Sequence, residues 1–285
     1  MKFTTFEHNG HRHAGVVSDG RVIGLASAGF PDMISVLAAG NEAVRRIEDF
    51  VTRAPESAIM PRESVKLCAP IPRPPKVLCM GLNYYDHAIE SNMDIPQVPT
   101  IFAKYPNTVI GPEDKIVLPK NSVKPDYEAE FAFIIGKGGR HIKAADWRNH
   151  VFGYTNFNDV SARDFQMATS QWTMGKNFDS FAPMGPHIVS ADEIEDPHKL
   201  DISLTLNGEK LQNSNTSELI FKIPETLAFL SSVMTLEPGD VISTGTPSGV
   251  GFSRKPPKWL TPGAVVAVFI QGIGELRNTC IAEAS

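Results

Sequence analysis

The sequence predicts an α+β protein that is rich in β-structure and begins with a small separate unit. Short alternating or apolar segments outnumber helical patterns over most of the 285 residues. The stretch "APIPRPPK" at 69–76 holds four prolines and disfavours both helix and sheet interior. The later strands are not interleaved with regular helices, so a doubly wound parallel sheet is a poor fit. We therefore expect a small α+β domain over 1–70 and a β-rich domain over 71–285.

Composition and charge indicate an ordinary globular protein. Apolar residues make up 42% and charged residues 21%, and the net charge is -5. Without a run of lysines or arginines, a nucleic-acid partner is not expected. Three cysteines (Cys68, Cys79 and Cys280) favour a reducing compartment over a disulfide framework. No apolar stretch approaches membrane-spanning length and no signal peptide is recognisable, so we expect a cytoplasmic protein that does not bind membranes.

The first seventy residues carry one hairpin signal and two helix signals. Asp19-Gly20 separates two alternating segments, which is typical of a tight β-hairpin. Asp32 and Asn41 are candidate caps of two short helices, the second being "EAVRRIEDFVTRA" at 42–54. These elements account for the small α+β unit.

The rest of the chain reads mainly as strands. Asn207-Gly208 marks another tight hairpin, and Pro224 is suited to the first turn of a helix over 224–236. The segments that read as strands or strand-turn units are 76–88, 126–137, 200–214, 239–247 and 263–279.

Two glutamates in "DYEAEFAFIIGK" (126–137) are unusual for a buried strand. Residues two apart in a strand point to the same face, so Glu128 and Glu130 lie side by side, with Asp126 on the same side. Two such carboxylates repel each other unless a cation lies between them or one keeps its proton. The alternative is an ordinary solvated strand face.

A third carboxylate stands in the dense polar run "GYTNFNDVSARDFQ" at 153–166. Asp159 there could belong to an ordinary loop and helix cap. It could instead join Glu128 and Glu130 in an all-oxygen site, which suits Mg²⁺, Mn²⁺ or Ca²⁺ and does not suit zinc.

Five motifs in order give the chain a resemblance to a known family. They are "GLNYYDHAIE", "DYEAEFAFIIGK", "NDVSARDFQ", "GKNFDSFAPMGP" and "ISTGTPSGVG". Together they resemble the fumarylacetoacetate hydrolase family from about residue 70 to the C-terminus. The stretch "FSRKPPKWLTPG" is similar to the family's subgroup called fumarylacetoacetate hydrolase domain-containing protein 2. The first unit resembles the small domain that bacterial relatives carry. The resemblance implies a mixed β-roll and a homodimer.

The resemblance also implies roles for individual residues. Glu128, Glu130 and Asp159 match the Mg²⁺ ligands of the family, with Mn²⁺ or Ca²⁺ as alternatives. His87 and Glu90 match a pair that activates water from a mobile lid. The matching substrate-binding positions are Tyr85, Arg163, Gln166, Lys176 and Thr246. Among them, Arg163 has a supporting role and Lys176 is also catalytic.

The spacing of His87 and Glu90 supports such a pair. Residues three apart on a helix can touch, and a carboxylate on one ring nitrogen raises the basicity of the other. The alternative is an ordinary surface contact. Gly81 before the pair and the segment 90–99 after it would let this helix hinge over a ligand.

The implied reaction is metal-dependent hydrolysis of a carbon–carbon bond in a 2,4-dioxo acid, giving pyruvate and a carboxylic acid. A divalent ion would act as a Lewis acid on the 2-oxo group. Oxaloacetate decarboxylation and 2-oxo acid tautomerisation or isomerisation pass through a similar enolate, and family likeness does not choose among them. Leu82 stands where some relatives have arginine, which favours a different tail, such as that of a sugar-derived acid. A further alternative is a family member without catalytic activity.

Overall fold

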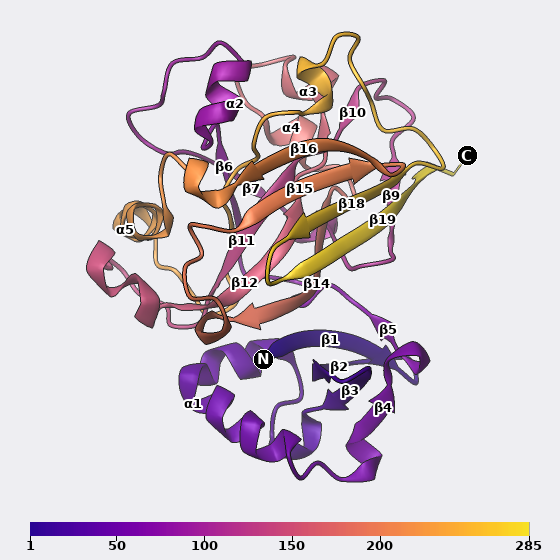
Figure 1. Ribbon diagram of the computed structural model, residues 1–285, viewed down its shortest axis with the longest axis vertical. Helices are drawn as coiled ribbons and strands as arrows, with labels where there is room; N and C mark the ends of the chain where they lie inside the picture. The colour runs from indigo at the N-terminus through magenta and orange to yellow at the C-terminus, as the bar shows by residue number, and fades with distance from the viewer. Residues whose placement is uncertain (285) are drawn as a thin grey trace.

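The computed structural model describes residues 1–284, and the side chain of Asn41 lies outside the described part. The first seventy residues form antiparallel strands and one long kinked helix, drawn in indigo and purple in Figure 1. The strands are β1 (Lys2–His8), β2 (His11–Ser18), β3 (Arg21–Gly24), β4 (Ile59–Pro61) and β5 (Lys66–Leu67), and the helix is α1 (Met33–Val51).

The hairpin signal and the first of the two cap signals of this unit are confirmed. Asp19 and Gly20 have φ values of 47° and 71° and join β2 to β3. Asp32 caps α1, since its carboxylate accepts a hydrogen bond from the Ser35 N–H at 2.8 Å. Gly40 breaks the helical backbone (φ 61°, ψ -147°), so α1 consists of two helical parts, and the predicted cap at Asn41 lies outside the described side chains.

One large sheet runs through the molecule. Its order is β4-β3-β2-β1-β14-β12-β11-β17-β6-β7, with β5 on β1 and β8 on β14. Lys2 pairs with Val189 and Phe3 with Ile188, so the sheet passes without a break from the first unit into the rest. The domain boundary at residue 70 stays a prediction. The further strands are β6 (Val77–Gly81), β7 (Thr100–Lys104), β8 (Val109–Ile110), β11 (Ala129–Ile135), β12 (Val151–Asn158), β14 (Ala182–Ser190) and β17 (Val241–Ser243).

A second sheet packs against the first and completes a mixed, strand-rich α+β fold, as predicted. It has the order β16-β15-β18-β19-β9, with β9 parallel to β19 and the other pairs antiparallel. Its strands are β9 (Lys115–Leu118), β15 (Asp201–Leu206), β16 (Glu209–Asn215), β18 (Val265–Ile270) and β19 (Gly274–Ala282). A two-stranded sheet pairs β10 (Pro125–Asp126) with β13 (Ser161–Ala162), and the helices are α2 (Tyr85–Glu90), α3 (Arg163–Gln166), α4 (Thr173–Lys176) and α5 (Ile223–Val233).

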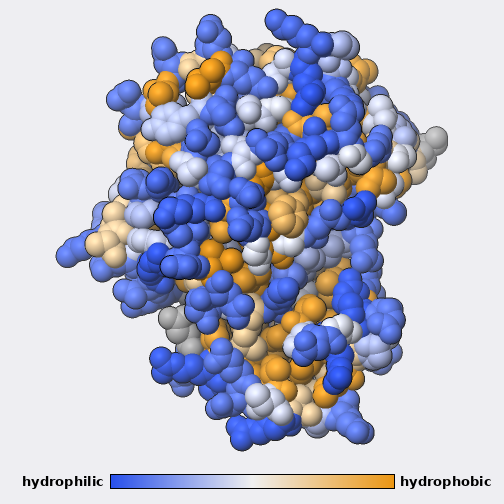
Figure 2. All heavy atoms as spheres, viewed as in Figure 1, coloured by the Kyte–Doolittle hydropathy of each residue, from blue (hydrophilic) through white to orange (hydrophobic). Residues whose placement is uncertain are grey.

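Strand β11 lies at the centre of the core. All seven of its residues are buried, and Phe131 stacks on Tyr154 of β12 with ring centroids 5.3 Å apart. Charged and polar side chains cover most of the face seen in Figure 2, as expected when the apolar residues fill the interior. None of the described helices is long and apolar enough to cross a membrane.

Candidate metal and 2-oxo acid site

A cavity of about 570 Å³ collects most of the predicted site residues. It lies beside the short helices α2, α3 and α4, at the end of the molecule away from the N-terminal unit (Figure 1). The predicted residues that line it are His87, Glu90, Glu128, Glu130, Arg163, Gln166, Lys176 and Thr246. Tyr85 is 41% exposed and is not among the lining residues, so the structure does not place it against the cavity.

Three carboxylates meet beneath this cavity. Oxygens of Glu128, Glu130 and Asp159 all lie within 4.8 Å of one another. Pairing of Ala129 with Asn158, and the hydrogen bond from the Asp159 N–H to the Glu128 carbonyl at 3.0 Å, brings Asp159 beside the glutamates. The alternative of a solvated strand face is wrong, because none of the three side chains is more than 7% exposed.

Asp126 does not join this group. Its carboxylate accepts hydrogen bonds from the backbone N–H groups of Gly251 (2.8 Å) and Phe252 (2.9 Å) and from the Arg163 Nε (2.9 Å). It therefore anchors a loop and Arg163, which in turn lies 2.6 Å from a Glu128 oxygen. The supporting role of Arg163 in substrate binding stays a prediction.

Two lysines neutralise part of the carboxylate charge. The Lys176 Nζ bridges Glu128 (2.7 Å) and Asp159 (2.5 Å). Lys104, which the sequence analysis missed, is fully buried and donates to Asp159 at 2.5 Å and to the Val160 carbonyl at 3.0 Å. Only the alternation of inward and outward residues in β7 could have indicated that Lys104 is buried. A single lysine in that stretch gave no indication of burial.

Glu130 lacks a partner of opposite charge among the described side chains. It accepts hydrogen bonds from the Ser243 hydroxyl (2.5 Å) and the Gly245 N–H (3.2 Å). Burial, together with repulsion from Asp159 and Glu128, raises the pKa of Glu130 well above its ordinary value. Such a carboxylate needs either a proton or a further cation beside it.

These residues fit a hard divalent ion. With every group ionised, the buried cluster has four carboxylates against three cations and carries one negative charge; its members are Asp126, Glu128, Glu130, Asp159, Lys104, Arg163 and Lys176. A divalent ion beside Glu130 would reverse that charge and leave the cluster attractive to an anionic ligand. No histidine or cysteine belongs to the described triad, which disfavours zinc.

The predicted pair on α2 is in contact. His87 Nδ1 lies 3.4 Å from a Glu90 carboxylate oxygen, which leaves the other ring nitrogen for the cavity that His87 lines. Both Glu90 oxygens also lie 3.0 Å from the Gly249 nitrogen. Burial raises the pKa of Glu90, but hydrogen bonds from His87 and the Gly249 N–H outweigh burial, so the pKa lies below its ordinary value.

Helix α2 is fastened to the neighbouring loop by a second carboxylate. Asp86 accepts hydrogen bonds from the Ser214 hydroxyl (2.7 Å) and from the Ser248 N–H and hydroxyl (both 3.3 Å). Gly81, predicted as a hinge, has a packing role too, because a Cβ atom there would lie 2.3 Å from the Trp172 ring. The helix that carries His87 is thus held over the cavity.

Two further predicted residues offer donors to the cavity. The Gln166 side-chain oxygen accepts from Arg163 Nη1 at 2.9 Å, which leaves its amide NH₂ available. Thr246 follows Gly245, whose φ of 91° favours glycine and whose N–H donates to Glu130 at 3.2 Å. The residues thus include donors for a carboxylate as well as ligands for a metal.

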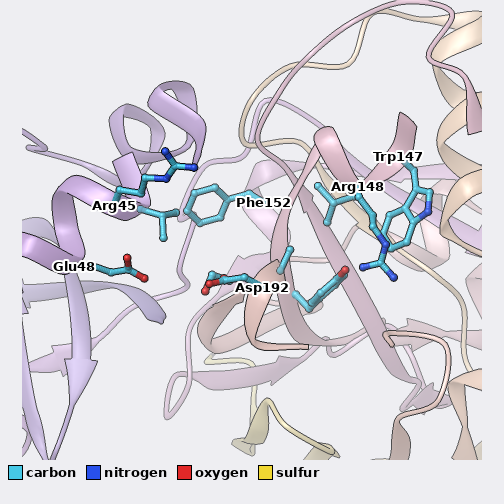
Figure 3. Close-up of a pocket in the computed structure, with 11 residues that line it drawn as sticks. Arg45, Glu48, Trp147, Arg148, Phe152 and Asp192 are labelled. Atoms are coloured by element: carbon cyan, nitrogen blue, oxygen red, sulfur yellow. The ribbon is translucent and has the colours of Figure 1, made fainter. Parts of the chain in front are cut away.

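A second hollow, of about 420 Å³, lies elsewhere. In Figure 3, Arg45 and Glu48 of α1 face Trp147 and Arg148 of the 3₁₀ helix Ala144–Asn149 across it. Charges of both signs line this hollow, and the described carboxylate triad is not part of it. The cavity beside α2 is therefore the candidate site.

Comparison with known proteins gives the family. The family profile "Fumarylacetoacetate (FAA) hydrolase C-terminal" matches residues 76–281. The chain belongs to the fumarylacetoacetate hydrolase family. It is 47% identical over 225 residues to "Oxaloacetate tautomerase fahd2, mitochondrial" from Xenopus laevis, covering 78% of this chain and 70% of the relative. It is 46% identical to the human protein "Oxaloacetate tautomerase FAHD2A, mitochondrial" over 230 residues, covering 80% and 73%.

Solved structures agree with this membership. A fumarylacetoacetate hydrolase from Exiguobacterium antarcticum superposes with a TM-score of 0.88 and 36% identity, covering 99% of this chain and all of that one. A maleylpyruvate hydrolase from Sphingobium sp. SYK-6, in complex with manganese (II) ion and pyruvate, gives a TM-score of 0.85 and 29% identity and covers both chains fully. The chain is therefore an enzyme of a family whose members include hydrolases, isomerases and tautomerases.

One prediction is wrong. A cytoplasmic location is contradicted by the names of the frog, rat, human and bovine relatives at 46–47% identity, all of which include the word mitochondrial. Free cysteines indicate only a reducing compartment, so composition could not separate one such compartment from another. The homodimer stays a prediction.

Proposed function

We propose that the chain is a divalent-metal-dependent tautomerase that interconverts the keto and enol forms of oxaloacetate. The observation that carries the proposal is the buried triad of Glu128, Glu130 and Asp159 beneath a cavity that also presents His87. The relatives at 46–47% identity named oxaloacetate tautomerase support the choice of reaction. Hydrolysis of a carbon–carbon bond, the reaction expected from the sequence, is a second candidate function.

The chain's own groups match the needs of a proton shift. Glu128, Glu130 and Asp159 would hold Mg²⁺ or Mn²⁺, which would polarise the 2-oxo group when bound. We assign substrate carboxylate oxygens to Lys176 and to the Gln166 amide, because both residues line the cavity. The free ring nitrogen of His87 would take the proton from C3 and return it to the oxygen of C2, so that neither water nor carbon dioxide is exchanged.

Glu90 supports this role of His87. Its carboxylate, kept ionised by His87 and by the Gly249 N–H, orients the ring and stabilises the imidazolium that forms after proton abstraction. Without Glu90 the ring would lose this contact and would be free to turn.

The test follows the decay of enol-oxaloacetate by its ultraviolet absorbance. With Mg²⁺ we expect the decay to be faster than in protein-free buffer, and we expect EDTA or Glu130→Gln to remove the acceleration. His87→Asn should lower the rate by roughly 100-fold or more, the usual range for loss of a general base. An unchanged rate in EDTA, or in both variants, would refute the proposal.

A second candidate is hydrolysis of a 2,4-dioxo acid to pyruvate and a carboxylic acid. The contact between His87 and Glu90 favours it, because the same pair suits the activation of water. Pyruvate release from an acylpyruvate and from a sugar-derived dioxo acid measures this activity. Carbon dioxide from oxaloacetate, recorded in the same experiment, would instead indicate a decarboxylase.

A further inference from the structure

Gln212 connects the strand of the metal-binding glutamates to the loop that carries Thr246. It lies in β16, at the edge of the second sheet, and is 1% exposed. Its side-chain oxygen accepts a hydrogen bond at 2.9 Å from the N–H of Ala129, the residue between Glu128 and Glu130. Its NH₂ donates to the Thr246 hydroxyl at 2.8 Å and to the Pro247 carbonyl at 2.9 Å.

These partners fix the orientation of the amide. A backbone N–H can only donate and a carbonyl can only accept, so the oxygen must face Ala129 and the NH₂ must face Pro247. Consequently the Thr246 oxygen receives a hydrogen from Gln212. The hydroxyl hydrogen of Thr246 has no acceptor among the described residues, and Thr246 lines the cavity.

We propose that Gln212 is a positioning residue that directs the Thr246 O–H hydrogen into the cavity, where it donates to a carboxylate or oxo oxygen of the bound 2-oxo acid. This inference rests on the proposed function of the site. Gln212 itself is not among the residues that line the cavity. Its effect is to fix, before binding, the orientation of a hydroxyl that would otherwise rotate freely about its C–O bond.

A double-mutant cycle separates this role from a merely structural one. The variants are Gln212→Met, Thr246→Val and the two combined, with Asn213→Ala as a control at an exposed position of the same strand. For each, kcat/KM with oxaloacetate and the Kd of oxalate, a planar mimic of the enolate, are measured in Mg²⁺. We expect each single variant to weaken oxalate binding roughly tenfold, the effect of losing one hydrogen bond to a charged group.

The decisive comparison is between the effect of Gln212→Met in the wild type and its effect in the Thr246→Val variant. If Gln212 acts through Thr246, Gln212→Met should have an effect at least about threefold smaller in the Thr246→Val background than in the wild type. An equal effect in both backgrounds would overturn the inference. Asn213→Ala should change neither quantity.

A second variant keeps the test valid if Gln212→Met does not fold. Gln212→Glu retains an acceptor for the Ala129 N–H but offers no hydrogen to Thr246, and its carboxylate would take the hydroxyl hydrogen instead. We expect it to show the same dependence on Thr246, and independence would again overturn the inference. A wild type that binds oxalate without tautomerising oxaloacetate would refute the proposed function only, since the cycle in Kd still tests Gln212.

Discussion

Replacement of Lys104 by methionine should destabilise the protein strongly, although the residue is absent from the cavity lining. The Lys104 Nζ lies 2.5 Å from an Asp159 oxygen and 3.0 Å from the Val160 carbonyl, and both charged side chains are 0% exposed. Methionine keeps most of the apolar stem but leaves one side of Asp159 without a cation. The cluster then carries one more negative charge in a region that water does not reach.

The size of the effect follows from this burial. Removing one partner of a buried ion pair costs about 3–5 kcal/mol of unfolding free energy, since the remaining charge stays desolvated. Lys176 still contacts Asp159 at 2.5 Å, which places the expected loss near the lower limit, about 3 kcal/mol. Bound Mg²⁺ would replace part of the missing charge, so the loss should be larger in EDTA than in Mg²⁺.

Urea denaturation of the wild type and Lys104→Met, each in EDTA and in Mg²⁺, measures both effects. Lys115→Met, at an exposed position of β9, is the matched control and should stay within about 0.5 kcal/mol of the wild type. A loss below about 1 kcal/mol for Lys104→Met would mean that Lys104 does not stabilise a buried charge on Asp159, and it would contradict this prediction. An equal loss of unfolding free energy with and without Mg²⁺ would show that the charge of Lys104 does not act on the metal site.

Three further results are expected. Mg²⁺ at roughly 100 times its Kd should stabilise the fold by about 2.7 kcal/mol in thermal melts, and EDTA should reverse this; no shift would contradict a metal site. Asp86→Ala should speed amide hydrogen exchange in α2 and lower kcat/KM, because three hydrogen bonds from Ser214 and Ser248 are lost; unchanged exchange would show that Asp86 does not fasten the helix. Glu90→Gln should lower the free energy of unfolding at pH 7. The pKa of Glu90 is lower in the folded protein than its unfolded value of about 4.3, so the ionised carboxyl stabilises the fold above that pH. This contribution is lost as the pH falls through the folded pKa. A destabilisation that is the same at every pH would contradict this reading of Glu90.

Local signals were sufficient for the hairpins and for part of the site. Asn207 and Gly208 have φ values of 52° and 81°, the tight turn that their sequence predicts. The spacing of His87 and Glu90 allowed their contact, and the glutamates two apart in β11, together with the family resemblance, indicated a shared site with Asp159. The hairpin and the contact of His87 with Glu90 each lie within a short stretch of sequence, whereas Asp159 reaches the glutamates through the pairing of β11 with β12.

Other features depend on contacts between distant parts of the chain. The polar residues Thr155, Asn156 and Asn158 lie in β12, a strand that the sequence did not predict. All three are buried and have hydrogen-bond partners from elsewhere in the chain. Lys104 and Gln212 approach the site from β7 and β16, and their partners lie 55 and more than 30 residues away. A pattern along one strand cannot indicate such partners.

The proposed function requires that Glu128, Glu130 and Asp159 hold a divalent ion. Calorimetric titration of Mg²⁺ or Mn²⁺ into EDTA-treated and dialysed protein tests it directly, with Glu130→Gln beside the wild type. We predict one ion per chain in the wild type and at least a roughly 10-fold weaker Kd in the variant, since the carboxylate without a cationic partner is removed. Equal binding by both proteins, or no binding by the wild type, would contradict the claim.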